Sequence, residues 1–287
     1  TVVKQGGSAE QVAELDPKIV NYELLGVFAL TEPDHGSDVA GGLQTTASQN
    51  DDGTWTINGA KRWIGGAFQA DVLCTFARDT ADNQVKAFLV PREAEGVSLE
   101  KIERKASLRI MQNADIYYDN VQVPGDARLL NINSFRDVAK CLRLLRSDVS
   151  WIAAGAMAGA YEAAVRYTTN REQFGKPIAG FQLIQEKLAT MLGNVTASVA
   201  LAMQLTEQQD AGVYKDENSA LAKMFTASKL RETVALAREV CGGNGITLDT
   251  DVARFHADAE AVYSYEGTHE INALIVGRAI TGQSAFV

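Results

Sequence analysis

The stretch VQVPGDARLLNINS, residues 121–134, separates two kinds of sequence pattern in this chain. Before it, apolar and polar residues alternate in short segments, as they do in half-buried strands. After Ser134, apolar residues recur every three or four positions, as they do on one face of a helix. The sequence therefore predicts strands before this stretch and helices after it.

The strand-like part runs from about Phe28 to Val123 and contains turn residues at short intervals. Trp55 and Ile57 alternate with threonines, and the Asn58-Gly59 pair that follows is preferred in tight hairpin turns. A second turn is expected at Asp119-Asn120. Strands at this spacing are typical of a small antiparallel barrel or sandwich. No strand–helix–strand alternation is present, so a dinucleotide-binding Rossmann domain is not expected.

The helical part contains at least two long amphipathic or alanine-rich patterns. One face is formed by Ile184, Leu188, Met191, Val195, Val199 and Met203. Residues 219–241 form a second pattern that ends at Gly242-Gly243-Asn244-Gly245, and residues 151–171 are rich in Ala and Gly, as close helix packing requires. Two or three long helices with a shorter pair predict a four-helix bundle.

Length and composition limit the class of protein. A chain of 287 residues is long enough for two packed units, and 46% hydrophobic with 22% charged residues is ordinary for a soluble globular protein. A net charge of −9 argues against nucleic-acid binding. The three separated cysteines favour a reducing compartment, and the richest apolar run, Trp151–Ala160, is too short to span a membrane. Neither nucleic acid nor membrane is an expected partner.

Four stretches contain the residues that could carry chemistry. They are Thr31–Asp38 (TEPDHGSD), Arg171–Gly175 (REQFG), Cys241–Gly245 (CGGNG) and Tyr265–His269 (YEGTH). The first follows an apolar strand at residues 27–30, and its backbone N–H groups and small hydroxyls suit the carbonyls of a heterocycle or a phosphate. Each stretch taken alone is also compatible with an ordinary turn or surface segment.

In this order the four stretches resemble the acyl-CoA dehydrogenase family, and the match extends from Thr31 to Phe286. The resemblance implies an α+β fold, with a central antiparallel β-barrel domain at residues 28–130 and a C-terminal four-helix bundle at residues 131–287. Residues 1–27, a helical segment followed by a connector ending at Asp16-Pro17, are expected to be the tail of an N-terminal helical domain largely absent from this chain. Stretches at residues 61–64, 107–109, 185–192 and 277–282 look closest to the glutaryl-CoA dehydrogenase branch and related short-chain acyl-CoA oxidases.

The resemblance implies FAD as the cofactor. The contacts that it implies are Phe28, Leu30, Thr31, Gly36, Ser37, Trp63, Ile64, Gly65, Arg171, Gln173, Phe174, Phe181, Gln182, Glu239, Gly242, Gly243, Thr268 and Glu270. Trp63 would pack on the isoalloxazine ring, which suits the flat face of an indole. Gly65 stands where a threonine is common in the family, so this position has no side-chain hydroxyl to offer the flavin.

Arg171 and its loop are implied to reach the adenine and pyrophosphate of FAD bound by a neighbouring subunit, since guanidinium is a natural phosphate partner. A homo-oligomer, a tetramer, is therefore expected. The residues alone are also compatible with a Trp63 side chain buried in the core. They are likewise compatible with an Arg171 that only stabilises the C-terminal end of a helix through the helix dipole.

Glu266 is implied to be the base that removes the α-proton of the substrate. Tyr265 and the apolar Ala261-Val262 predict a dry setting, which raises the pKa of a carboxyl group toward working pH. Some branches of the family place the base on an earlier helix, beside an arginine matched here by Arg146. The corresponding position in this chain is Leu145, which cannot act as a base.

The other implied substrate contacts are Ser37, Tyr265 and Gly267, and Arg146 is implied to lie near the catalytic carboxylate. On the residues alone, Arg146 is equally compatible with a surface position. The three histidines lack metal-ligand spacing, so no metal site is expected.

The expected function is FAD-dependent α,β-dehydrogenation of a short-chain acyl-CoA or glutaryl-CoA, in which a hydride passes from the β-carbon to flavin N5. A dehydrogenase would pass electrons to an electron-transfer flavoprotein. The alternatives are an acyl-CoA oxidase that uses oxygen and a non-catalytic flavin-binding scaffold. The expected location is the cytoplasm in a bacterium, or the mitochondrion or peroxisome in a eukaryote.

Overall fold

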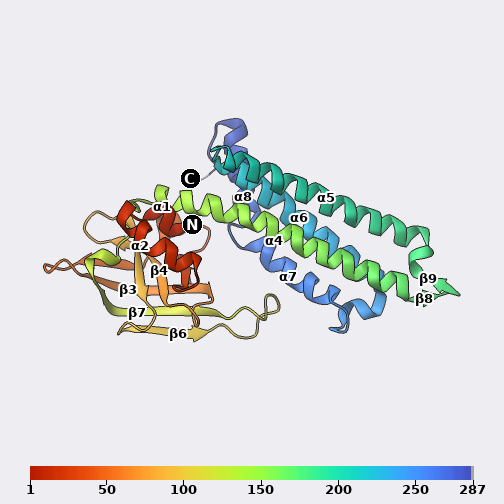
Figure 1. The fold of residues 1–287 in the computed structure, drawn as a ribbon, viewed down its shortest axis with the longest axis horizontal. Helices are drawn as coiled ribbons and strands as arrows, with labels where there is room; N and C mark the ends of the chain where they lie inside the picture. Colours follow the sequence, from red (N-terminus) through yellow and green to blue (C-terminus); the bar gives the residue numbers. More distant parts are fainter. Residues whose placement is uncertain (286–287) are drawn as a thin grey trace. The chain divides into compact units, whose positions relative to one another are not determined.

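The computed structural model describes residues 1–285, so Phe286, where the family resemblance ends, lies outside the described residues together with Val287 (Figure 1). The chain forms two compact units. The first, called the β unit below, comprises Thr1–Lys105 and Arg109–Cys141. The second, the helical unit, comprises Ala106–Leu108 and Leu142–Val287. The mixed α+β class with a helical C-terminal part is confirmed.

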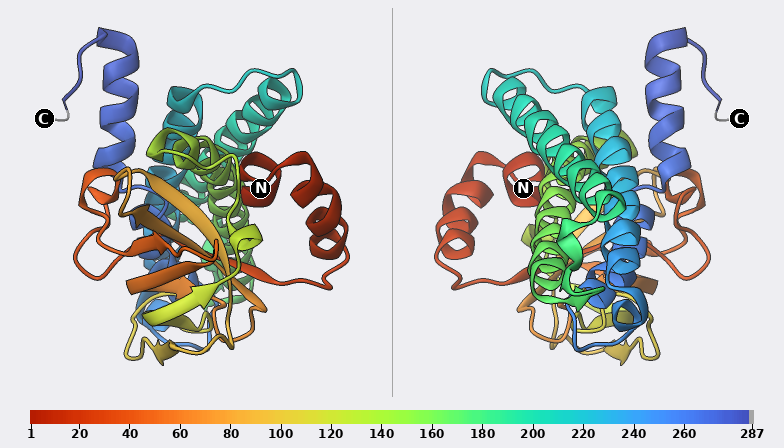
Figure 2. Two further views of the ribbon diagram at one scale, coloured as in Figure 1. Left: turned by 90° about the vertical axis from the view of Figure 1, so that its left-hand side faces the viewer. Right: turned by 90° about the vertical axis from the view of Figure 1, so that its right-hand side faces the viewer.

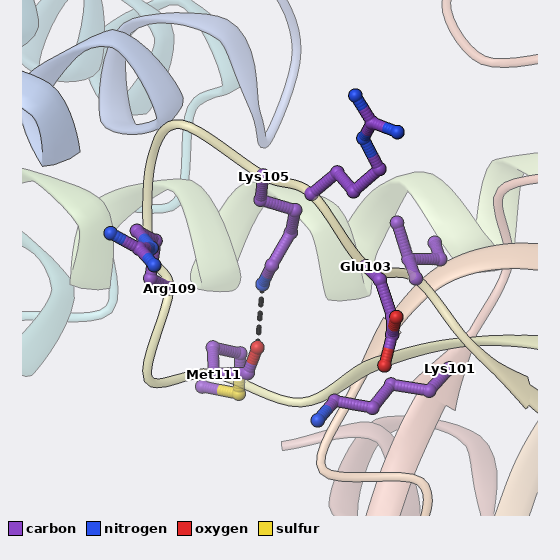
Figure 3. A pocket seen from close by; sticks show the side chains of 7 residues that line it. Lys101, Glu103, Lys105, Arg109 and Met111 are labelled. Atoms are coloured by element: carbon purple, nitrogen blue, oxygen red, sulfur yellow. Dashed lines mark hydrogen bonds between the residues drawn. The ribbon is translucent and has the colours of Figure 1, made fainter.

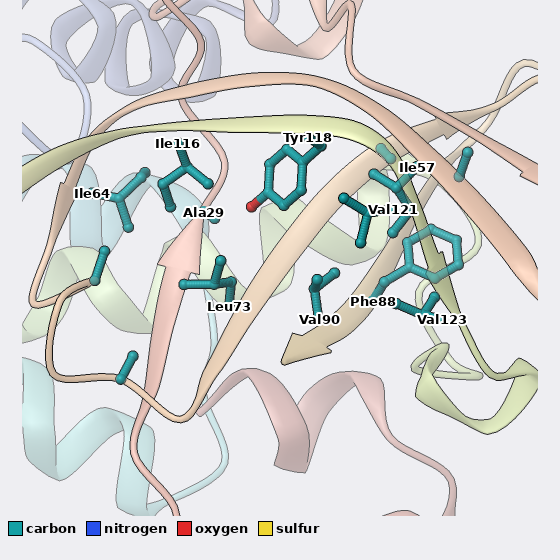
Figure 4. Close-up of a cluster of buried hydrophobic side chains, with 14 of the residues drawn as sticks. Ala29, Ile57, Ile64, Leu73, Phe88, Val90, Ile116, Tyr118, Val121 and Val123 are labelled. Carbon is teal, nitrogen blue, oxygen red and sulfur yellow. The ribbon is translucent and has the colours of Figure 1, made fainter. Parts of the chain in front are cut away.

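The β unit is built on one curled, seven-stranded sheet. Its strands are β1 (Gly26–Ala29), β2 (Thr46–Gln49), β3 (Trp55–Gly65), β4 (Val72–Asp79), β5 (Val85–Pro91), β6 (Val97–Lys101) and β7 (Asn113–Val123). The strand order is β1-β4-β2-β3-β7-β6, and β5 pairs with β4. Figure 4 shows the apolar side chains that gather on one face of this sheet, among them Ile57, Leu73 and Ile116, all fully buried.

The expectation of a purely antiparallel sheet is wrong. β1 and β2 both pair with β4 in parallel, β1 along Val72–Thr75 and β2 at Arg78 and Asp79. The segment between them, which includes the short helix α3 (Val39–Gly42), returns the chain so that both strands run in the same direction. Local turn residues do not reveal such pairing, because parallel neighbours are joined through distant connections. The other pairings are antiparallel, and the closed barrel stays a prediction.

Two of the predicted turns are not turns. Asn58-Gly59 lies inside β3, and Asp119-Asn120 lies inside β7, where the register of the two strands shifts. The backbone N–H of Asn120 donates to Asn58 Oδ1 at 2.7 Å. Gly59, at φ 143°, approaches Thr45 so closely that a Cβ would lie 2.7 Å from its Cα. The same residue types that favour turns therefore form a β-bulge here.

The N-terminal segment forms two helices, α1 (Val2–Gly6) and α2 (Ala9–Val20). Ser8 begins α2 with a capping box, because its hydroxyl accepts from Gln11 N while the Gln11 side chain accepts from Ser8 N. The expected connector ending at Asp16-Pro17 is wrong, since α2 continues through Pro17. Proline removes one hydrogen bond there, and α2 ends three residues later at Val20.

As far as residue 285, the helical unit contains three long helices and a shorter pair, within the predicted two or three long helices and a shorter pair. They are α4 (Phe135–Asn170), α5 (Gln182–Asp210), α6 (Asp216–Val240), α7 (Val252–Ser264) and α8 (His269–Thr281), with the small strands β8 (Glu172–Gln173) and β9 (Lys176–Pro177) and the 3₁₀ segments η2 (Ile178–Gly180) and η3 (Gly242–Ile246). A third 3₁₀ segment, η1 (Gly125–Ala127), lies in the β unit. Figure 2 shows α4, α5 and α6 side by side. Their shared core includes Met157, Met191 and Leu230, all fully buried. The four-helix bundle itself stays a prediction.

α5 is long and apolar enough to cross a membrane by length and composition alone, a property that core helices of soluble proteins share. Only 28% of its most apolar 18-residue window is buried within the chain. Leu183, Leu192 and Met203 are among its exposed apolar side chains. α5 therefore presents an apolar surface that this chain does not cover by itself.

Candidate active site and cofactor-binding segments

Glu266 lies in the short loop between α7 and α8. Tyr265 ends α7, and its N–H donates to Ala261 O at 2.9 Å. Thr268 begins α8, where its hydroxyl accepts from Ile271 N at 3.3 Å. Between these caps, Glu266 has φ 53° and Gly267 has φ 82°, both in the left-handed region. A non-glycine residue in this region is uncommon and persists only where its surroundings hold it.

Two side chains hold the carbonyls of this loop. Lys223 of α6 is fully buried, and its ammonium donates to Tyr263 O and to Gly267 O, both at 2.8 Å. Asn272 of α8, also fully buried, donates to Gly267 O at 2.9 Å and to Thr268 O at 3.0 Å. The backbone on either side of Glu266 is therefore fixed by two helices.

The electrostatics of Glu266 are those of a buried acid near two cations. Burial raises the pKa of Glu266, while the charges of Arg146 and Lys223 oppose the rise and Asp148 adds to it slightly. Glu266 Oε2 is buried and has no hydrogen-bond partner among residues 1–285. Within the same residues the Glu266 backbone N–H donates no hydrogen bond either. The result is a carboxyl group with raised proton affinity and unused hydrogen-bonding atoms.

Arg146 and Tyr265 complete the surroundings of this carboxyl group. Arg146 lies half-buried on α4, and its Nε is buried without a partner in the described part of the chain. Burial lowers the pKa of Arg146, and the charges of Glu266 and Asp216 oppose the shift. Burial, and then the charge of Glu266, raises the pKa of Tyr265 to about 12, so its phenol stays neutral at physiological pH. Arg146 and Glu266, both predicted from the sequence, thus lie within electrostatic reach of each other.

In the β unit, a buried ion pair joins two of the predicted flavin-binding segments. Lys61 Nζ lies 2.8 Å from Glu32 Oε1 and 3.1 Å from Leu30 O. The Glu32 carboxylate also accepts from the backbone N–H groups of Gln44 and Thr45. Arg62 N donates to Thr31 O at 2.8 Å. Loop 31–38 and the end of β3 are thereby fixed to each other.

Trp63 is placed outward by an irregularity of β3. The register of β3 against β7 shifts between Lys61 and Ile64, and Trp63 has φ 68°. Its side chain is 52% exposed, while Lys61 and Ile64 on either side are buried. A bulge that re-aims a side chain in this way is common beside functional sites. The alternative of a core tryptophan is therefore excluded within this chain.

The remaining predicted residues of the β unit differ in what they can offer. Thr31 is partly exposed, and Gly36 and Ser37 are exposed. Leu30 and Ile64 are each 4% exposed, so their side chains lie in the core of the unit. Phe28 packs on Phe76 with ring centroids 4.8 Å apart, and Gly65 lies against Met111.

The predicted residues of the helical unit fall into two groups. Thr268 and Glu270 lie beside the Glu266 loop. Arg171, Gln173 and Phe174 form the exposed β8–β9 hairpin, in which Phe174 is 93% exposed with φ 54°. Its ring makes an edge contact with Phe181, which precedes Gln182 at the start of α5.

Glu239 lies in the last turn of α6, and its side chain reaches α5, the helix that follows the β8–β9 hairpin. It pairs with Lys187 of α5 at 3.4 Å. Gly242, at φ 57°, and Gly243 follow in η3 with open space around them. Sixteen residues of α6 separate Lys223 from Glu239, about 24 Å at 1.5 Å per residue. This chain therefore keeps the Glu266 loop and the Glu239–Gly243 segment well apart along α6.

Sequence reasoning missed Lys61, Glu32, Lys223 and Asn272. A signal was present for Lys223: it shares a helix face with Ala227 and Leu230, both buried, so it is a lysine at an apolar position of the pattern. Lys61 likewise follows the inward alternation of Trp55 and Ile57 in β3. Charged residues at buried positions need partners, and the sequence does not name them.

A hollow of about 240 Å³ lies in the β unit between β6 and β7, lined by Lys101, Ile102, Glu103, Arg104, Lys105, Arg109 and Met111. Figure 3 shows Lys105 reaching across it to the Met111 carbonyl. None of these residues belongs to the predicted site, so the hollow does not identify it. Among residues 1–285 no three His, Cys, Asp or Glu side chains gather as a metal site would require.

Comparison with known proteins decides the family. The family model "Acyl-CoA dehydrogenase, middle domain" matches residues 27–121, and "Acyl-CoA dehydrogenase, C-terminal domain" matches residues 135–281. This chain belongs to the acyl-CoA dehydrogenase family. Members of this family are FAD-dependent oxidoreductases.

Individual relatives agree along nearly the whole chain. An acyl-CoA dehydrogenase of Bacillus subtilis is 34% identical over 96% of this chain and 73% of its own length. Two glutaryl-CoA dehydrogenase structures from Mycobacterium smegmatis, one in complex with FADH2, have TM-scores of 0.93 at 38% and 35% identity, over 99% of this chain and 73% of theirs. Butyryl-CoA dehydrogenase from Megasphaera elsdenii has a TM-score of 0.92 at 31% identity, over 97% of this chain and 73% of its own.

Proposed function

We propose that this protein binds FAD and dehydrogenates a short-chain acyl-CoA or glutaryl-CoA between its α and β carbons, with Glu266 as the base. One observation carries the proposal: among residues 1–285 the buried Glu266 Oε2 has no hydrogen-bond partner, and its loop is held in left-handed backbone geometry. Strained backbone and an unpaired carboxylate are unfavourable for stability, so their retention favours a catalytic role. In this proposal residues 28–130 bind flavin and substrate, residues 131–287 form a four-helix bundle with the base and the oligomer contacts, and residues 1–27 end an N-terminal helical domain.

The residues present fit a flavin. Trp63 offers an exposed flat face, loop 31–38 offers the hydroxyls of Thr31 and Ser37, and Gly242 and Gly243 leave open space for a close backbone approach. Arg171, exposed on its hairpin, suits a pyrophosphate. When bound, FAD would take up the two electrons that leave the substrate as a hydride.

The chain's own part in the chemistry is proton removal. Glu266 accepts the α-proton, and because burial raises its pKa it is a stronger base than an exposed carboxylate. Arg146 and Lys223 oppose that rise, because their positive charges favour the ionised carboxylate. The Glu266 N–H, which has no acceptor in the described residues, can donate to the thioester oxygen and stabilise negative charge there. Ser37, Tyr265 and Gly267 are the proposed neighbours of the thioester.

The partners follow from the same layout. The base loop and the Glu239–Gly243 segment lie about 24 Å apart along α6. One chain therefore offers two separate groups of cofactor contacts, as expected if Arg171, Gln173, Phe174, Phe181 and Gln182 reach the FAD of a neighbouring subunit. The uncovered apolar face of α5 also favours a homo-oligomer, and we propose a tetramer. An electron-transfer flavoprotein is the proposed acceptor.

Anaerobic titration of the flavin-loaded full-length protein with a panel of acyl-CoAs tests the proposal. Bleaching of the flavin absorbance by a short-chain acyl-CoA or by glutaryl-CoA is expected, and carbon dioxide release with glutaryl-CoA would assign the glutaryl branch. Glu266→Gln should bind flavin and fold but show almost no turnover. Retained turnover in that variant would overturn the role of Glu266.

Two other functions have distinct outcomes in the same assay. Hydrogen peroxide release upon addition of acyl-CoA without another acceptor would identify an acyl-CoA oxidase. A flavin spectrum that no acyl-CoA changes would identify a flavin-binding scaffold. The similarity to glutaryl-CoA and butyryl-CoA dehydrogenases favours the dehydrogenase over both. The cytoplasm in a bacterium, or a mitochondrion or peroxisome in a eukaryote, remains the proposed location.

A further inference from the structure

The charge of Lys223 acts on Glu266, but the two hydrogen bonds that Lys223 donates have no part in the proposed chemistry. Lys223 carries a fully buried ammonium group, and in the described part of the chain it donates no hydrogen bond to a carboxylate, although the charge of Glu266 acts on it from farther away. Its hydrogen bonds go to two backbone carbonyls, those of Tyr263 and Gly267. Burying a cation without a directly paired anion is costly, and an uncharged helix former such as Met or Leu could fill this position in α6. A structural role in packing alone does not account for a lysine here.

The geometry of the two carbonyls connects Lys223 to Glu266. Tyr263 lies in the last turn of α7 and Gly267 lies just beyond the base, so the two acceptors stand on either side of Glu266. Asn272 approaches Gly267 O from α8 and adds a bond to Thr268 O. Gly267 O thus accepts from two helices at once, at 2.8 Å and 2.9 Å. Space on this side is filled, because a Cβ on Gly267 would lie 3.2 Å from Asn272 Nδ2.

We propose that Lys223 and Asn272 act together as a clamp that positions Glu266, by holding its backbone in the left-handed conformation and thereby aiming its carboxylate. The inference rests on the proposed role of Glu266 as the base. Both clamp residues act through the loop and are positioning residues. Left-handed geometry at a glutamate is unfavourable in isolation, so several fixed hydrogen bonds are needed to maintain it. A base must be held within a fraction of an ångström to keep its rate.

The two clamp residues differ in charge, and this separates their effects. Lys223 lowers the proton affinity of Glu266, whereas Asn272 is neutral. The charged groups that act on Glu266 are Arg146 and Asp148 from α4 and Lys223 from α6, and Glu270 of α8 acts on Lys223. Burial lowers the pKa of Lys223 to about 8, so it is mostly charged at pH 7. Removing Lys223 should alter geometry and proton affinity together, and removing the Asn272 amide should alter geometry alone.

The test compares Lys223→Met, Asn272→Leu and the control Lys229→Met in the flavin-loaded full-length protein. Lys229 lies on the same helix, partly exposed and paired with Glu232, so its loss removes a similar charge without touching the loop. For Lys223→Met we expect kcat to fall about 100-fold with KM within about twofold, and the acid limb of the kcat–pH profile to move to higher pH. For Asn272→Leu we expect a smaller fall, about tenfold, with the limb unmoved. Lys229→Met should match the parent protein in kcat, in KM and in the position of the acid limb.

Hydrogen exchange of the loop amides supplies a readout that does not depend on turnover. Both clamp variants should exchange the Tyr265 amide, which donates to Ala261 O where α7 ends, at least about tenfold faster than the parent, because the loop is no longer held by two helices. If Lys223→Met does not fold, Asn272→Leu decides through exchange and kcat. Unchanged exchange, kcat and pH profile in the clamp variants, with Glu266→Gln inactive, would overturn the clamp and leave the proposed function intact. An active Glu266→Gln would overturn the proposed function itself.

Discussion

The buried pair Glu32–Lys61 provides the sharpest test of how the β unit holds loop 31–38, the loop proposed to bind flavin. The two charged groups lie 2.8 Å apart, with side chains 3% and 0% exposed. Lys61→Met removes the cation and leaves the Glu32 carboxylate buried without a counter-charge, with neutral donors such as the N–H groups of Gln44 and Thr45 as its partners. Removing one partner of a buried pair typically destabilises a protein by about 3–5 kcal/mol, and we expect that range here.

The magnitude depends on the charge left behind, and a second variant isolates that charge. Glu32→Gln combined with Lys61→Met leaves no buried ion, so its loss of stability should be smaller than that of Lys61→Met alone. The surface pair Glu14–Lys18 is the matched control in the same unit, at 3.0 Å with side chains 69% and 47% exposed. Lys18→Met should change the free energy of unfolding by about 0.5 kcal/mol or less, because solvent screens the pair.

Urea unfolding of the full chain, followed by circular dichroism and tryptophan fluorescence, measures these differences. FAD affinity should fall in Lys61→Met, since the ion pair fixes loop 31–38 to the strand that carries Trp63. Two results would refute the reasoning. One is a Lys61→Met variant as stable as Lys18→Met, and the other is a double variant that is less stable than Lys61→Met.

Three further predictions concern single sites. Glu266→Gln should raise the free energy of unfolding near pH 8 by on the order of 1 kcal/mol, because burial raises the pKa of the Glu266 carboxyl group in the folded protein. The protonated carboxyl group favours the folded state at low pH, and this stabilisation is lost as the pH rises through the pKa of the folded state. Urea unfolding at a series of pH values measures the effect, and identical stability–pH curves for parent and variant would contradict it. Trp63→Leu should weaken FAD binding at least about tenfold with little loss of stability, since the indole is 52% exposed. Fluorescence titration with FAD measures the affinity, and thermal melting of the apoprotein measures the stability. Unchanged affinity would remove Trp63 from the proposed site. Gly159→Ala should destabilise the helical unit by about 1–3 kcal/mol, because the added Cβ would lie 2.4 Å from Phe255 Cζ. Gly155→Ala is the control, since a Cβ at Gly155 would meet open space. Equal melting temperatures for the two variants would show that α4 and α7 are not in close contact.

Much of the architecture could be predicted from local patterns. Alternation at Val72–Phe76 and the apolar run ended by Pro91 became β4 and β5. The regular face from Ile184 to Met203 became α5, and the glycines after residue 241 ended α6. These succeed because strand and helix periods are properties of neighbouring residues.

The misplaced turns show where that reasoning ends. Asn58-Gly59 and Asp119-Asn120 have the composition of hairpin turns, and each is a bulge because the other lies opposite it. The parallel pairing of β1 and β2 with β4 is likewise a choice between strands far apart in the chain. No local window contains both partners, so the competition between a turn and a bulge is settled only in the folded sheet.

For this protein the sequence by itself determined the division into a strand-rich part and a helical part, the family, and Glu266 as the proposed base. Each of these depends on patterns among neighbouring residues or on motifs taken in their order along the chain. Only the tertiary structure decided what surrounds Glu266. Lys223 and Gly267 are 44 residues apart, and Lys61 and Glu32 are 29 apart. A buried charge must find its partners wherever the fold brings polar atoms within hydrogen-bond distance, and that encounter is a property of three-dimensional packing.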